Sequence, residues 1–205
     1  MRRAALLTAM IVTTPGVARA QRQDGMYGRL ERDLVLSAEV LGGAAQGRGG
    51  WAPAGEVTLR ARYLDMAGVA LGYRRGFGDG RDDALLLAVE LRPAFFARIN
   101  FNFERGPRWL DLMLDSIGVE LGAAWIRPGE AHGRGGGVGG VLGLGVELPL
   151  HWRDAAEAVM LRFGARWTFA SAWDAQGPGG AEDGVQLGLG LVVRAAVRGG
   201  VVPSR

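Results

Sequence analysis

The stretch VQLGLGLVVRAAV, residues 185–197, alternates between two kinds of side chain with a period of two. Its odd positions are all Val, Leu or Ala, whereas its even positions include Gln186, Gly188, Gly190 and Arg194. Because successive side chains of a β-strand point to opposite faces, this pattern predicts a strand with one apolar face and one face of small and charged residues. Glycine weakens a solvent-exposed strand, so the second face calls for an environment other than bulk water.

The same alternation recurs along the chain and predicts eight strands. They fall at residues 29–42, 56–64, 67–75, 84–102, 117–126, 140–150, 158–171 and 185–197. The fourth pattern continues past Pro93 without changing parity. Eight strands joined in sequence predict an all-β, antiparallel, up-and-down barrel.

One segment has a different period. Leu110, Leu114 and Ile117 follow helical spacing after Pro107, which predicts a short amphipathic helix over residues 107–116. The sequence leaves open whether this helix lies at a membrane interface or plugs the barrel. Long Gly-rich connections are predicted at 43–55, 76–82, 128–138 and 172–183, and mostly shorter turns join the strands at the other end, as in outer-membrane barrels.

The N-terminal residues have the layout of a secretory signal peptide. Two arginines precede an apolar run, and Ala18-Arg19-Ala20 forms a small-x-small cleavage site before Gln21. We therefore expect a signal peptide at 1–20 and a single exported barrel domain at 21–205. Without residues 1–20, 21 basic residues balance 21 acidic ones, which removes the case for a nucleic-acid partner.

Three observations favour a membrane barrel, whose apolar face would point outward, over a soluble one. The second face is rich in glycine, as a narrow closed interior would require. Tyr63, Tyr73, Trp125, Trp167 and Phe169 lie on the apolar parity near segment ends, which suits interfacial girdles. The segments are long enough for tilted strands that cross a bilayer, which need roughly 9–11 residues.

Charged residues on the second face would then lie inside the barrel, where both signs are present to pair. The predicted lumen network consists of Glu31, Glu39, Arg60, Arg62, Arg74, Glu90, Arg92, Glu120, Glu147, Arg162, Arg166 and Arg194. Arginine binds carboxylates with two parallel hydrogen bonds, and an isolated buried charge would be costly, so mutual pairing is the expected arrangement.

The sequence predicts no catalytic, cofactor or metal site. His132 and His151 lack a companion at metal-ligand spacing, and Ser37, Ser116 and Ser171 are not in a nucleophile-elbow motif. The Gly-rich run 133–145 lacks the lysine of a phosphate-binding loop and precedes a predicted strand. We therefore expect a protein that is not an enzyme.

The pattern and strand count resemble the small eight-stranded outer-membrane barrel proteins of OmpA-like or OmpX-like size. Such barrels commonly end on an aromatic residue, whereas this chain continues past its last predicted strand as GGVVPSR. The resemblance implies a barrel in the outer membrane, with outer-membrane lipid, the assembly machinery and an unknown partner at the Gly-rich loops as partners. Its role would be structural or surface interaction; the alternatives are a soluble periplasmic or secreted lipocalin-like barrel that binds a small apolar ligand, and a narrow polar pore.

Overall fold

The computed structural model shows eight antiparallel strands closed into one barrel, in which each strand pairs with its neighbours in sequence and β8 pairs with β1. The strands are β1 (Leu34–Gly47), β2 (Gly50–Tyr63), β3 (Ala67–Gly76), β4 (Asp83–Leu91), β5 (Gly118–Arg127), β6 (Gly137–Pro149), β7 (Val159–Phe169) and β8 (Gly184–Val197). The structure describes residues 34–47, 50–77, 83–95, 97, 108–127, 137–150, 159–169 and 184–197. The predicted eight-stranded up-and-down barrel is confirmed.

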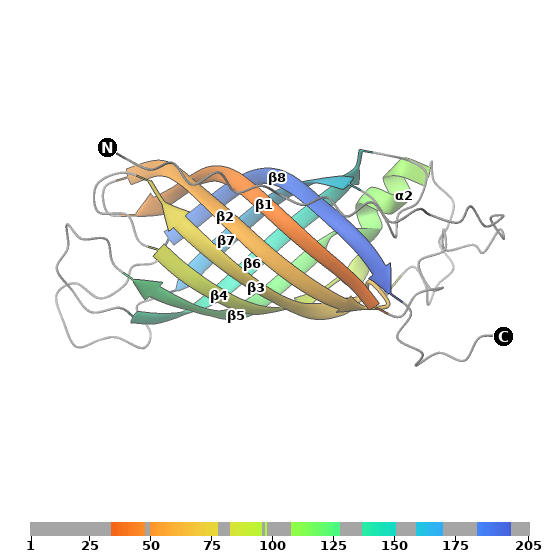
Figure 1. Cartoon of the computed structure of the whole chain (residues 1–205), viewed down its shortest axis with the longest axis horizontal. Helices are drawn as coiled ribbons and strands as arrows, with labels where there is room; N and C mark the ends of the chain where they lie inside the picture. Colours follow the sequence, from red (N-terminus) through yellow and green to blue (C-terminus); the bar gives the residue numbers. More distant parts are fainter. Residues whose placement is uncertain are drawn as a thin grey trace, which may run out of the picture.

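The barrel has two distinct ends, which we call the turn end and the loop end (Figure 1). The turn end, at the right of Figure 1, holds the start of β1, the end of β8 and the turn between β2 and β3. In that turn Leu64 and Asp65 have positive φ angles of 51° and 55°, and the Met66 amide donates to the Tyr63 carbonyl at 3.0 Å. A turn with positive φ at both central residues has a backbone twist that matches the right-handed twist of the two strands it joins.

Two predicted boundaries are wrong. The predicted loop 43–55 is mostly strand, because β1 and β2 continue toward each other as a long hairpin. Pro53 is tolerated in β2 because it lies beyond the last residue of β3, where a missing N–H breaks no ladder bond; its carbonyl accepts from the Phe77 amide at 2.9 Å.

The predicted fourth strand is too long at its C-terminal end. β4 ends at Leu91, and residues 93–95 and 97 are helical. Proline has no N–H for a strand ladder but fits the first turn of a helix, so Pro93 ends the strand although the apolar alternation continues.

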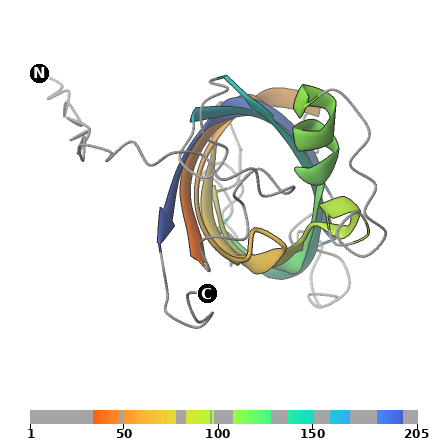
Figure 2. The same cartoon turned by 90° about the vertical axis from the view of Figure 1, so that its right-hand side faces the viewer.

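The predicted helix is present as α2 (Arg108–Asp115), between β4 and β5. It lies along the rim of the turn end, where it packs against β6, and does not cross the mouth of the barrel (Figure 2). Ser116, directly after α2, donates to the Glu147 carbonyl at 2.7 Å, and its Oγ accepts from the Glu147 amide at 2.9 Å. Since β5 begins only at Gly118, Ser116 completes the edge of β6 that β5 leaves uncovered.

Candidate functional site: a charge-filled lumen

Among the described residues, the inward face of the barrel carries buried charged side chains of both signs. Six arginines and six carboxylates, each at most 8 % exposed, form the lumen network. Its members are Glu39, Glu56, Arg60, Arg62, Asp65, Glu90, Arg92, Glu120, Glu147, Arg162, Arg166 and Arg194. They come from every strand except β3, and also from the turn between β2 and β3 and from the residue that follows β4.

Glu147 on β6 is the hub of the network toward the turn end. Its carboxylate accepts from Arg62 at 2.9 Å, from Arg92 at 2.8 Å and from Arg162 at 2.7 Å, and it also pairs with Arg194. These guanidiniums come from β2, β7, β8 and the end of β4, so one carboxylate ties together elements on different sides of the barrel. Hydrogen bonds between ionised partners are roughly twice as strong as those between neutral partners.

Asp65 extends this hub to the turn between β2 and β3. Its carboxylate lies 3.0 Å from Arg92, 3.3 Å from Arg194 and 3.6 Å from Arg62. Asp65 is only 2 % exposed. It lies in the turn with positive φ angles, and its side chain points into the lumen toward these arginines. The network therefore extends from β6 to the turn between β2 and β3.

Arg60 joins two carboxylates that would otherwise repel each other. Glu90 on β4 and Glu120 on β5 are direct cross-strand partners, an arrangement that destabilises a sheet when the charges are alike. The Arg60 guanidinium reaches Glu90 at 3.1 Å through Nε and Glu120 at 2.9 Å through Nη2, and it also pairs with Glu39. Arg162 adds a bond of 2.7 Å to Glu120.

The network ends toward the loop end with a mixed charged and polar group. Arg166 donates to Glu120 at 2.7 Å and pairs with Glu56. Glu56 also accepts from Thr58 at 2.5 Å and from the Gln186 amide at 3.1 Å. A cavity of about 10 Å³ adjoins Arg166 and Gln186, which is near the smallest volume that holds one water molecule.

Glycines make room for these large side chains. A Cβ added at Gly145 would lie 2.4 Å from Arg162 Nη2, and one at Gly118 would lie 2.7 Å from Glu90 Oε1. At Gly190 the obstacle is backbone, since an added Cβ would meet the Val40 carbonyl oxygen at 2.0 Å across the β1–β8 seam. The glycines on the inward face therefore serve two purposes: space for the network and close approach of strands in a narrow barrel.

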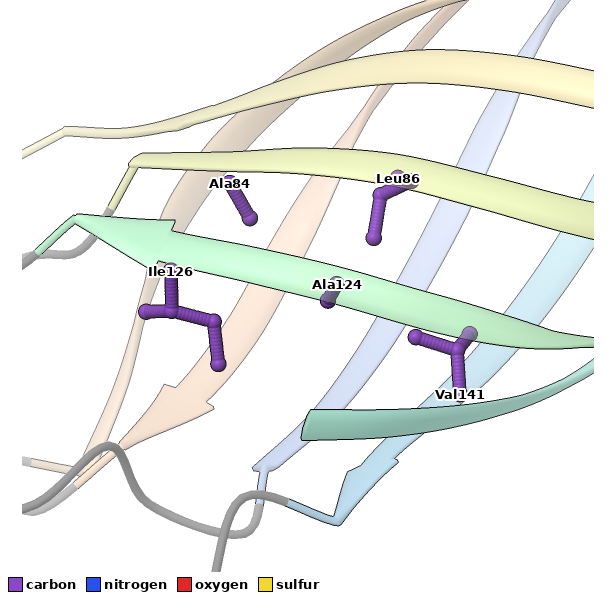
Figure 3. Close-up of a cluster of buried hydrophobic side chains, with 5 residues drawn as sticks. All are labelled: Ala84, Leu86, Ala124, Ile126 and Val141. Atoms are coloured by element: carbon purple, nitrogen blue, oxygen red, sulfur yellow. The ribbon is translucent and has the colours of Figure 1, made fainter. Parts of the chain in front are cut away.

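Beyond the network, the inner wall formed by β4, β5 and β6 near the loop end is apolar. The apolar cluster consists of Ala84, Leu86, Ala124, Ile126 and Val141, each at most 4 % exposed. Figure 3 shows these side chains on β4, β5 and β6, gathered on the inner face of the barrel.

The structure brings together ten of the twelve residues of the predicted network, from Glu39 to Arg194. Arg74 is half-buried at the loop end of β3, opposite Glu56 in the strand register, and Glu31 lies outside the described residues. The prediction missed Glu56, although its parity was inward, and Asp65, whose place in a turn gives no periodic signal.

The described residues contain no group of three metal-ligand side chains, and no described helix is long and apolar enough to span a membrane. Of the candidate serines, Ser37 is buried in β1 and Ser116 is bound to the backbone of Glu147. Several predictions lie outside the described residues: the predicted signal peptide 1–20, the predicted loop 172–183, the C-terminal segment 199–205, and Ser171, His132 and His151.

The outward face of the same strands is apolar. Leu59, Leu71, Leu121, Leu144 and Leu191 are between 49 % and 68 % exposed, although each lies well inside a strand. Trp125, Trp167 and Phe169 are exposed near the loop end, where the rings of Trp167 and Phe169 are stacked at 6.3 Å. The fold and the lumen together define a closed eight-stranded barrel with polar residues inside and apolar residues outside.

Comparison with known proteins gives a structural likeness. The crystal structure of Neisserial surface protein A (NspA) is similar to this chain, with 14% sequence identity and a TM-score of 0.45 over 78% of this chain and 96% of that one. No protein-family profile matches the sequence, and no curated protein sequence matches it significantly.

Proposed function

We propose that this chain is an exported outer-membrane barrel, not an enzyme, whose lumen is filled by ion pairs and whose role is structural or surface interaction at its loop end. The observation that carries the proposal is the inversion of the barrel, with charges buried inside and large apolar side chains exposed outside. A soluble monomer rarely exposes an apolar patch larger than a few hundred Å². Hydrocarbon is the solvent that favours such a surface, and a closed barrel leaves no strand edge unpaired in it.

The soluble alternative requires the opposite arrangement. A lipocalin-like barrel binds an apolar ligand inside, so its inward parity would be apolar around a sizeable cavity. Here the middle of the lumen holds six arginines and six carboxylates. The narrow-pore alternative requires a continuous water path, which paired side chains from opposite walls of an eight-stranded barrel block.

Two separate arginine substitutions, one at mid-strand and one at the loop end, test whether the outward face contacts a membrane. Leu71 lies in the middle of β3 and is 49 % exposed, whereas Gln46 faces outward at the loop end of β1. An arginine on the lipid face costs about 2–4 kcal/mol at the midplane and about 0–1 kcal/mol near the interface. We expect Leu71→Arg to lower the urea midpoint of the detergent- or bilayer-inserted barrel strongly and Gln46→Arg to change it little.

Fractionation provides the complementary test. We expect the protein in the membrane fraction, extracted only with detergent, with a heat-modifiable shift on gels. Recovery in the soluble periplasmic fraction, together with equal effects of Leu71→Arg and Gln46→Arg, would show that the outward face does not contact lipid. Single-channel recording addresses the pore: stable conductance of the unmodified protein would contradict a filled lumen.

A further inference from the structure

The outward face of the described strands is uncharged except at one place. Its charged residues are Arg75 on β3, Asp83 on β4 and Arg127 on β5. All three lie at the loop end of three consecutive strands, and Asp83 and Arg127 are direct cross-strand partners. Charges that only marked a membrane boundary would be spread around the barrel, so their confinement to one sector suggests a local purpose.

Aromatic side chains lie directly beside these charges. Tyr73 and Trp125 precede Arg75 and Arg127 on the same face, and they are 46 % and 45 % exposed. The Tyr73 hydroxyl donates to Asp83 Oδ2 at 2.8 Å. Tyr and Trp at such positions mark the depth of lipid head groups in barrels.

Both arginines are exposed at this depth. Within the described part of the chain, neither guanidinium forms an ion pair with a carboxylate within 4.0 Å, in contrast to the six arginines of the lumen network. Asp83 accepts a hydrogen bond from Tyr73. Together, Arg75, Arg127 and Asp83 carry one net positive charge. Two guanidiniums with forked N–H donors, on the strands that flank β4 and beside an exposed apolar face, match a phosphate group attached to acyl chains.

We propose that Arg75 and Arg127, with Tyr73 and Trp125, form a binding site for the phosphate-bearing head group of a lipid in the leaflet at the loop end, with Asp83 orienting Tyr73. The acyl chains would lie against the apolar face of β3, β4 and β5, where Leu71, Leu85 and Leu87 are exposed. This inference rests on the proposed membrane location, because the site exists only if the outward face contacts lipid.

The test compares two lipids that differ only in phosphate. Dioleoyl phosphatidic acid and dioleoylglycerol are titrated into the detergent-solubilised protein, and native mass spectrometry measures the apparent dissociation constants. We expect preferential binding of phosphatidic acid that excess inorganic phosphate does not displace, because the acyl chains contribute. A basic residue near an anionic lipid surface contributes about fivefold in affinity, so Arg75→Gln with Arg127→Gln should weaken binding about thirtyfold.

A variant that makes the site more positive provides the control, because it should change lipid affinity in the opposite direction. Asp83→Asn removes the negative charge but keeps an oxygen that can accept from Tyr73, so we expect phosphatidic acid to bind more tightly, by about fivefold. Equal binding of the two lipids, or an arginine double variant that binds like the unmodified protein, overturns the site while leaving the membrane barrel intact. A protein recovered without detergent overturns both proposals, so the two failures are distinguishable.

Discussion

The lumen network and the apolar cluster fill the same barrel in different ways. Toward the turn end and in the middle, long charged side chains lie against glycines such as Gly118 and Gly145. Near the loop end, Ala84 and Ala124 pack with Leu86, Ile126 and Val141. Closure of eight strands fixes the interior volume, and the two regions show that either ion pairs or apolar packing can fill it. Only the ion pairs make each side chain depend on several specific partners.

The largest expected effect comes from the hub of the network. Glu147→Gln removes the charge that faces Arg62, Arg92, Arg162 and Arg194. Breaking a buried ion pair by removing one partner costs about 3–5 kcal/mol, so we expect a large fall in the urea midpoint and loss of the heat-stable form on gels. Asp83→Asn, the same chemical change on the exposed face, is the control and should leave the midpoint unchanged. A similar midpoint for both variants would mean that the network contributes no stability.

A smaller effect is expected in the apolar cluster. Ile126→Ala removes buried methylene groups, which costs about 2–5 kcal/mol in general. We expect a value of about 2–3 kcal/mol, because the neighbouring alanines let the site collapse. Leu121→Ala, at a 68 % exposed position on the same strand, is the matched control. If Ile126→Ala destabilised the barrel more than Glu147→Gln, the ranking of the two regions would be reversed.

The smallest effect is expected where α2 joins the barrel wall. Ser116→Ala leaves the amide and the carbonyl of Glu147 without the partner that the serine provides, at a cost of about 1–2 kcal/mol. Hydrogen exchange should report this locally, as faster exchange of the Glu147 amide. Ser37→Ala is the control, since the Ser37 hydroxyl has no hydrogen-bond partner among the described residues. Unchanged exchange at Glu147 would contradict the role of Ser116 in covering β6.

Alternation predicted the strands and the inward direction of most charges, because a period of two determines which face each residue occupies. Alternation failed where strand pairing, turn geometry or proline determines the local structure. The Gly-rich composition around Trp51 predicts a loop, but these residues form part of β2 because they pair with β1. Asp65 enters the lumen only because of a turn with positive φ angles, and Pro93 ends a strand whose apolar pattern continues.

The outward patch was not predicted, for a different reason. Arg75, Asp83 and Arg127 are each unremarkable in sequence, since they stand at the edges of predicted loops. Their proximity depends on the register of β3, β4 and β5, which joins residues more than 40 positions apart. The ion-pair partners within the lumen were not predicted either: alternation identified ten members of the network, but it did not show that four arginines share Glu147.

Arg194 has a consequence for the order of assembly. β8 supplies one charged residue to the lumen, and that residue reaches Asp65 and Glu147. Within the twelve-residue lumen network of the described residues, removing Arg194 leaves six carboxylates with five arginines, so Glu147 and Asp65 each lack one partner until β8 is in place. Docking β8 against β1 pairs the final free strand edges and completes the ion pairs of Glu147 and Asp65 in one event, which favours an all-or-none closure over a stable partly formed barrel.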